Sequence, residues 1–104
     1  MEIDYANSQM RKTLESSILI GKKYGHLRRK LEIRLSELRT VDSLAEISQN
    51  PPPRRHKLTH NKAGCWGVDV SKNWRIILMP IGRFDPDNLN TITRVQILDI
   101  EDYH

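Results

Sequence analysis

One group of residues able to carry out acid–base chemistry is the run Glu101-Asp102-Tyr103-His104, near the end of the 104-residue sequence. It follows a stretch rich in Val, Ile and Leu. Histidine titrates near neutral pH and commonly transfers protons, and a tyrosine ring can stack on a nucleobase. Terminal residues are often frayed and without function, so residue chemistry alone favours a frayed end over a site.

A second group is cationic and lies in the middle of the sequence. It consists of Arg54, Arg55, His56, Lys57, His60, Lys62 and Arg75. Lysine and arginine hold phosphate groups and stabilise charge that develops in a transition state. The alternative is a solvated surface that only aids solubility. Arg75 favours a cleft, because it interrupts an apolar run directly after Trp74.

Two other kinds of site are less well supported by the sequence. His56 and His60 have the i, i+4 spacing of helical zinc ligands, but they follow Pro51–Pro53 and have no second Cys/His cluster. The sequence therefore predicts no metal site. Cys65 lies between Gly64 and Trp66 without a recognisable base, which favours a buried structural thiol over a nucleophile.

The charge is unevenly distributed along the chain. Residues 1–83 hold 16 Lys and Arg against 8 Asp and Glu, whereas residues 84–104 hold one Arg against 5 acids. The basic part suits a polyanion such as nucleic acid, and it fits a solvated helix face equally well. The single cysteine, short apolar runs and acidic Glu2 and Asp4 predict a cytoplasmic single domain without a membrane span or secretory signal.

Hydrophobic periodicity indicates which elements position these residues. Alternation predicts a short strand at 2–5, and one further short strand fits around 55–58. The pattern also predicts helices at roughly 6–17 and 22–40, a short helical turn at 43–48, a hairpin at 66–79 and a last strand at 91–100. In that last strand Val95, Ile97 and Asp99 would share one face, and Gln96, Leu98 and Ile100 the other. This order predicts an α+β domain, with two N-terminal helices packed on a small antiparallel sheet.

With these elements in order, the sequence resembles the RelE/ParE superfamily of toxins, and within it the HigB-like killer proteins. The residues that carry the resemblance are Lys57-Leu58, Gly64-x-Trp66, Asn73-Trp74-Arg75-Ile76 and Glu101-Asp102-Tyr103-His104, with Tyr24-Gly25 and residues 35–39 in the leading helices. The Asp-Tyr-His after a hydrophobic strand is the most specific of these features.

The resemblance implies a RelE-like fold and a ribosome-dependent endoribonuclease that cuts mRNA in the ribosomal A site. Such enzymes use no metal or other cofactor. The 2′-hydroxyl attacks the adjacent phosphate, which gives a 2′,3′-cyclic phosphate and a free 5′-hydroxyl. The resemblance also implies a cytoplasmic toxin that is neutralised by a HigA-like helix-turn-helix antitoxin.

The resemblance also assigns roles to residues. His104 would transfer a proton, Tyr103 would stack on or orient the mRNA, and Asp102 would position a neighbouring group. Arg75 matches a phosphate-contacting arginine of the family. His60 and Lys62 are the best matches for a second group of family site residues, and an alignment shifted by one residue stays open there. His60, Lys62 and Asp102 all stay candidates for the general base. Further RNA contacts are expected from Arg54, Arg55, Lys57, Lys72 and Trp74.

Two departures from the family pattern leave alternatives open. RelE itself has lysines on the strand where this chain has Gly67 and Asp69, so the chemistry must depend on histidine. The loop at 80–90 is longer than in short members. One alternative is a ParE-like toxin that binds DNA gyrase without cleaving RNA, and another is a degenerate relative that binds RNA or antitoxin only. The Asp-Tyr-His run favours the nuclease.

Overall fold

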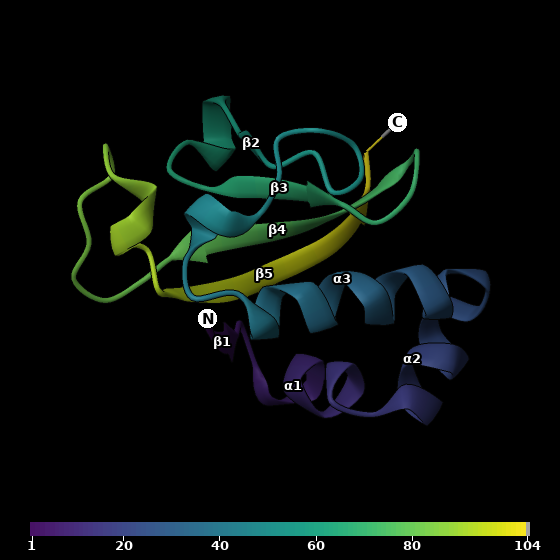
Figure 1. The fold of residues 1–104 in the computed structure, drawn as a ribbon. Coiled ribbons are helices and arrows are strands. Elements are labelled where there is room, and N and C mark those ends of the chain that lie inside the picture. Colours follow the sequence, from purple (N-terminus) through teal and green to yellow (C-terminus); the bar gives the residue numbers. More distant parts are fainter. Residues whose placement is uncertain (104) are drawn as a thin grey trace.

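The computed structural model describes residues 1–103 and has helices packed on one side of a β-sheet (Figure 1). The elements are β1 (Glu2–Tyr5), α1 (Ser8–Leu14), α2 (Ser17–Tyr24), α3 (Arg28–Thr40), β2 (His56–Lys57), β3 (Trp66–Asp69), β4 (Trp74–Pro80) and β5 (Arg94–Asp102). Short 3₁₀ turns lie at Gly25–Leu27, Leu44–Glu46, His60–Lys62 and Leu89–Thr91. The α+β class is confirmed. Within the described part of the chain, no helix has the length and apolar character needed to cross a membrane.

The sheet is mixed rather than wholly antiparallel. Its strand order is β1-β5-β4-β3-β2, and β2, β3, β4 and β5 form antiparallel pairs. β1 pairs in parallel with β5, with Glu2 opposite Arg94. The prediction of a purely antiparallel sheet is wrong for this one pair. The direction of β1 depends on how the helices return the chain to the sheet, which no local sequence pattern encodes.

The N-terminal helices begin and end at other residues than the apolar periodicity predicts, because capping residues set their ends. Ser16 has an extended backbone, and its side chain accepts a hydrogen bond from the Leu19 amide at 3.2 Å. The first helix therefore ends at Leu14, and the second begins at Ser17 rather than near residue 22. Gly25, with φ 44°, ends α2 and separates it from α3. The local caps override the longer hydrophobic pattern here.

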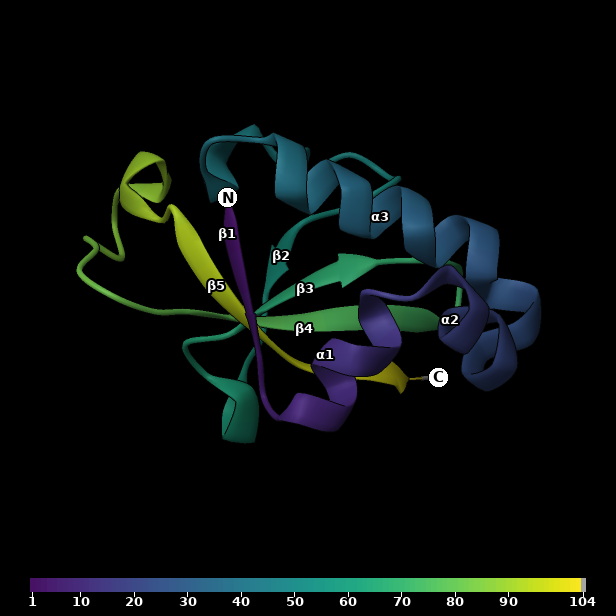
Figure 2. The ribbon, with the colours of Figure 1, turned by 90° about the horizontal axis from the view of Figure 1, so that it is seen from below.

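The main core lies between the helices and the sheet. Figure 2, seen from below, shows α1 crossing in front of the strands and α3 running alongside them. The main core includes Leu31, Leu35 and Leu38 of α3 and Ile76, Leu78, Val95 and Ile97 of the sheet. A smaller buried cluster of Leu58, Cys65 and Ile77 lies apart from it. Because side chains alternate along β4, Ile77 and Arg75 belong to the sheet face opposite the helices. We call this the open face.

A β-bulge in β5 sets which side chains reach the open face. Ile77 pairs with Asp99, but the neighbouring Leu78 pairs with Ile97, so Leu98 is the extra residue. As a result Val95, Ile97 and Ile100 all pack in the helix-side core. The predicted strict alternation along 91–100 is therefore wrong beyond Leu98. Beyond the bulge, Glu101 pairs with Arg75 across the strands and lies on the open face.

Candidate active site

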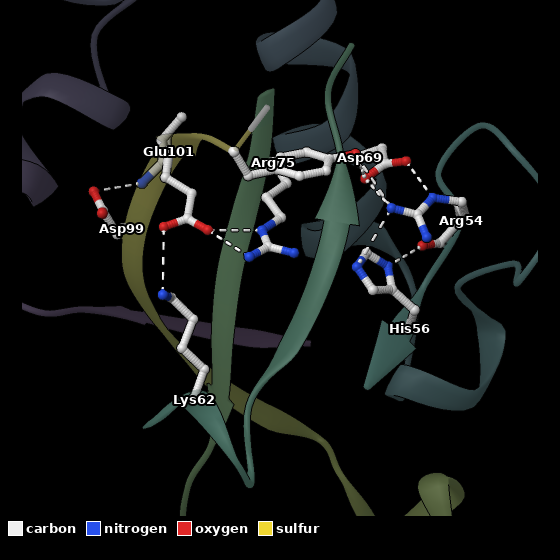
Figure 3. A network of polar contacts seen from close by, with 9 residues as sticks. Arg54, His56, Lys62, Asp69, Arg75, Asp99 and Glu101 are labelled. Atoms are coloured by element: carbon white, nitrogen blue, oxygen red, sulfur yellow. Dashed lines mark hydrogen bonds and ion pairs between the residues drawn. The ribbon is translucent and has the colours of Figure 1, made fainter. Parts of the chain in front are cut away.

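A network of polar side chains covers one end of the open face (Figure 3). β3, β4 and β5 contribute Asp69, Arg75 and Glu101. The segments before and after these strands contribute the remaining members, which are Arg54, His56, Lys62 and Tyr103. Residues far apart in the sequence thus meet in one cluster of cations, carboxylates and an imidazole.

Asp69 lies at the centre of one half of the network. Arg54 donates to both of its carboxylate oxygens, at 2.6 Å from Nε and 3.2 Å from a terminal nitrogen. The Tyr103 hydroxyl donates to the same carboxylate at 3.1 Å. The hydrogen bond to Asp69 is the main cause that raises the pKa of Arg54. Arg54 also has a left-handed backbone with φ 50°, which non-glycine residues adopt rarely and which is common at functional sites.

The His56 ring is held in one orientation beside this pair. Its Nδ1 lies 2.7 Å from the backbone oxygen of Arg54. A carbonyl oxygen can only accept, so Nδ1 carries the hydrogen. Nε2 lies 3.4 Å from a terminal nitrogen of Arg54, which can only donate. Nε2 is therefore the acceptor nitrogen of the ring, and the neighbouring Arg54 donates to it.

Arg75, Glu101 and Lys62 form the other half of the network. Arg75 donates from Nε to Glu101 at 2.8 Å, and a terminal nitrogen of Arg75 lies 2.6 Å from the same oxygen. Lys62 Nζ lies 3.8 Å from the second oxygen of Glu101. The guanidinium carbon of Arg75 also lies 4.4 Å from the centre of the Tyr103 ring. Glu101 thus holds two cations side by side, and the cation–π contact joins both halves of the network.

A pocket of about 360 Å³ opens beside these groups. It is lined by residues 56–62 and by Arg75. The exposed His60 lies at its wall in the left-handed region, with φ 57°. The pocket lining therefore combines two histidines with the three cations Lys57, Lys62 and Arg75, the side-chain types that transfer protons and bind phosphate.

The network includes some of the residues singled out from the sequence. Arg54, Lys62, Arg75 and Tyr103 lie in it, and His60 and Lys57 line the adjoining pocket. Asp102 is the exposed last residue of β5 and pairs in register with Trp74. His104 lies outside the described residues.

Other residues proposed to contact RNA lie elsewhere. Arg55 is only 9% exposed, donates to the backbone oxygen of Ile47 at 2.8 Å and stacks on Trp66. Burial lowers the pKa of Arg55. Trp74 packs edge-on against Tyr24 near the helix-side core, and Lys72 lines a separate groove. The structure does not bring these three residues to the open-face network.

Three members of the network are absent from the site predicted by sequence. In the sequence His56 stands out only by its spacing to His60 and by its place in the basic run. Asp69 stands out only because it replaces a lysine of the family pattern, and Glu101 only as the first residue of the closing run. One usable signal is Gly67, which lies opposite His56 in the β2–β3 register. A glycine within a strand often marks the close approach of another group.

Cys65 and the histidines give no sign of metal or thiol chemistry in the part of the chain described. Cys65 is buried, and burial raises the pKa of its thiol against the opposing effect of Lys62. Residues 1–103 contain no cluster of three or more His, Cys, Asp or Glu side chains that could hold a metal ion. This environment fits a structural role for the thiol.

The fold around this site is shared with several solved structures. No family model matches the sequence, and comparison with curated proteins also finds no match. Solved structures do match over nearly the whole chain. Similar structures include a YoeB/ParE toxin from Agrobacterium tumefaciens, with a TM-score of 0.59, 11% identity and 100% of both chains covered.

Two further structures extend this comparison. The Staphylococcus aureus YoeB-YefM complex gives a TM-score of 0.56 and 12% identity, over 100% of this chain and 97% of the other. A point mutant of YafQ from E. coli gives a TM-score of 0.61 and 14% identity, over 97% of this chain and 91% of that one. At such identities the likeness establishes the fold alone, which this chain shares with these YoeB, ParE and YafQ structures.

Proposed function

We propose that this chain is the toxin of a type II toxin–antitoxin pair, and that it cleaves mRNA in the ribosomal A site like the HigB-like proteins it resembles. The observation that carries this proposal is the meeting of His56, Arg75 and Tyr103 on the open face. Metal-independent RNA cleavage needs a proton acceptor near the 2′-hydroxyl, cations on the phosphate and a proton donor for the leaving oxygen. The network provides the acceptor and the cations.

In the proposed reaction the 2′-oxygen forms a bond to the adjacent phosphorus, and the bond from phosphorus to the 5′-oxygen breaks. His56 accepts the 2′-hydroxyl proton at Nε2, which carries no hydrogen because Nδ1 donates to the backbone oxygen of Arg54. In this step the Arg54 side chain, whose terminal nitrogen lies 3.4 Å from Nε2, turns from Nε2 to the phosphate. His104, by the resemblance, donates a proton to the departing 5′-oxygen. The products are a 2′,3′-cyclic phosphate and a free 5′-hydroxyl.

The cations hold the reacting phosphate in this proposal. Arg75 and Lys62 border the same pocket and share Glu101 as their partner. The phosphate therefore competes with the Glu101 carboxylate for them, and it gains charge-assisted hydrogen bonds as negative charge develops. Tyr103 orients the mRNA, and Asp102 positions a neighbouring group.

The ribosome and an antitoxin complete the proposed function. A ribosome that presents the mRNA in a bent, attack-ready conformation supplies positioning, which can contribute roughly 7–11 kcal/mol to a reaction barrier. An antitoxin with acidic or occluding segments would complement the cations of the open face. One solved structure with the same fold is a YoeB-YefM toxin-antitoxin complex, which supports this kind of partner.

The test is cleavage of a defined mRNA by the purified protein, with and without ribosomes programmed with that mRNA. We expect cuts within the A-site codon only when ribosomes are present, and fragments that end in a 2′,3′-cyclic phosphate. Absence of cleavage by a protein that still arrests growth would contradict the nuclease and favour the gyrase-binding alternative.

A further inference from the structure

A second groove, separate from the reaction pocket, lies between α3, the proline segment and the β3–β4 turn. Its volume is about 340 Å³. Its lining residues are Lys30, Arg34, Pro51, Pro52, Asp69, Val70, Ser71 and Lys72. Asp69 also hydrogen-bonds Arg54 and Tyr103 of the candidate active site. The groove therefore adjoins the active-site network at Asp69.

The groove is positively charged. Lys30, Arg34 and Lys72 contribute three cations, and Asp69 is the only acid among the lining residues. Both oxygens of Asp69 are already bound by Arg54, so its charge is compensated from the other side. Lys30 and Lys72 are exposed and form no ion pair within residues 1–103. An anion bound here would meet Lys30 and Lys72 without a competing internal partner, whereas Arg34 is paired with Glu37.

Arg34 adds a buried cation to this groove. The residue is 8% exposed, and one terminal nitrogen lies 3.1 Å from Glu37. Its Nε is buried and has no hydrogen-bond partner among the described residues. A buried guanidinium with an unmade hydrogen bond is unfavourable, and phosphate oxygens are acceptors that guanidinium groups bind well. Arg34 also lines the groove, so its positive charge favours an anion bound there, whereas its Nε itself is closed to solvent.

The remaining walls are mainly apolar. Pro51, Pro52 and Val70 place two pyrrolidine rings and an aliphatic side chain in the groove. A bare anion gains nothing from such surfaces, whereas a nucleobase or ribose buries apolar area against them. We propose that this groove binds one nucleotide of an RNA strand, with its phosphate on Lys30 and Lys72, near Arg34, and its base against the prolines.

The biological meaning of this subsite rests on the proposed function. If mRNA is the substrate, a nucleotide in the groove belongs to the same strand whose scissile phosphate lies at Arg75. Binding in the groove would then fix the strand on both sides of Asp69, because Asp69 borders the groove and is bonded to the active-site network. The subsite would add affinity and register without touching the reacting atoms.

The experiment is a nuclear magnetic resonance titration of the full chain with adenosine 5′-monophosphate, adenosine and inorganic phosphate as separate probes. The backbone amides of Val70, Ser71 and Lys72 report on the groove. We expect adenosine 5′-monophosphate to shift them, and to bind about tenfold more tightly than either fragment probe. The double variant Lys30→Gln/Lys72→Gln should weaken this binding about tenfold. The matched control, Lys12→Gln/Lys22→Gln, removes two exposed charges from α1 and α2 and should bind like the wild type.

Several results would overturn the inference. These are unshifted amides at 70–72, equal weakening in the two double variants, or inorganic phosphate binding as tightly as the nucleotide. The titration needs neither ribosomes nor cleavage, so it is independent of the nuclease test. Cleavage by a protein that binds no nucleotide here overturns the subsite alone. Nucleotide binding by a protein that cannot cleave supports the groove and contradicts only the proposed function.

Discussion

The imidazole of His56 lies against the backbone of Gly67, its partner across β2 and β3. A Cβ atom at position 67 would be 2.8 Å from Cε1 and 2.9 Å from Nε2 of the ring. No ordinary side chain fits at such distances, so the absence of a side chain at 67 makes room for the histidine. The hydrogen bond from Nδ1 to Arg54 then fixes which nitrogen remains an acceptor.

The variant Gly67→Ala should therefore impair catalysis more than folding. The added methyl group would displace the His56 ring, and cleavage should fall about 100-fold, at the lower end of what a general base contributes. Leu58, at 3.2 Å from the built Cβ, must also shift, which should lower the melting temperature slightly. Single-turnover cleavage and thermal unfolding measure the two effects. In the control Gly21→Ala, the new Cβ would meet the flexible Arg28 side chain at 3.2 Å, and activity should be unchanged. Full activity in Gly67→Ala would contradict the role of His56.

Glu101→Gln should separate stability from RNA binding. The change removes the negative charge that Arg75 and Lys62 share. In the ion pair of Arg75 with Glu101, the Arg75 side chain is 16% exposed and the Glu101 side chain 20%. We expect a loss of about 1–2 kcal/mol in unfolding free energy, measured by urea titration, because the pair is only partly buried. RNA should bind more tightly at low salt, since Arg75 loses its competing carboxylate. Weaker RNA binding by a folded variant would refute the proposed competition.

Asp69→Asn should loosen the contact between Arg54 and Tyr103. Asp69 accepts hydrogen bonds from both, and its side chain is 15% exposed. Loss of these charged hydrogen bonds should reduce the unfolding free energy by about 1–3 kcal/mol and should lower cleavage. The exposed Asp42 is the matched control, and Asp42→Asn should change neither quantity. Equal effects of the two substitutions would show that Asp69 has no special structural role.

Cys65 should make stability depend on pH in the alkaline range. Burial raises the pKa of its thiol above the ordinary value of 9.0, so the folded chain keeps a proton that the unfolded chain loses. The contribution of this thiol to stability is complete below the unfolded pKa and is lost as pH rises through the folded pKa. The unfolding free energy, measured by urea titration, should therefore fall less between about pH 8 and about pH 10 in Cys65→Ala than in the wild type. An identical loss would mean that the thiol ionises equally in both states.

Local patterns in the sequence predict much of this fold. The hydrophobic spacing on α3 and the β-rich runs of the hairpin determine which residues are buried. The Ser43–Glu46 spacing predicts a capping box, and the structure has that pair at the Leu44–Glu46 turn. Such features depend on contacts within a few residues, so the sequence alone can reveal them.

The site is harder to predict because it depends on long-range register. The bulge at Leu98 reverses the expected face of Glu101 and places it beside Arg75. No local pattern distinguishes a bulged strand from a regular one, since only the partner strand reveals the extra residue. Arg55 and His56 are neighbours in one basic run, yet strand geometry sends them to opposite faces. Charge clustering alone could not separate a core arginine from a candidate catalytic histidine.

The most direct test of the central claim compares His56→Ala with His26→Ala in ribosome-dependent cleavage of a defined mRNA. His26 is an exposed histidine in the turn before α3, so its removal controls for loss of an imidazole. We predict that His56→Ala folds, still associates with ribosomes and cuts the A-site codon at least about 100-fold more slowly. The His26→Ala variant should match the wild type. Wild-type cleavage by His56→Ala would contradict the proposed active site.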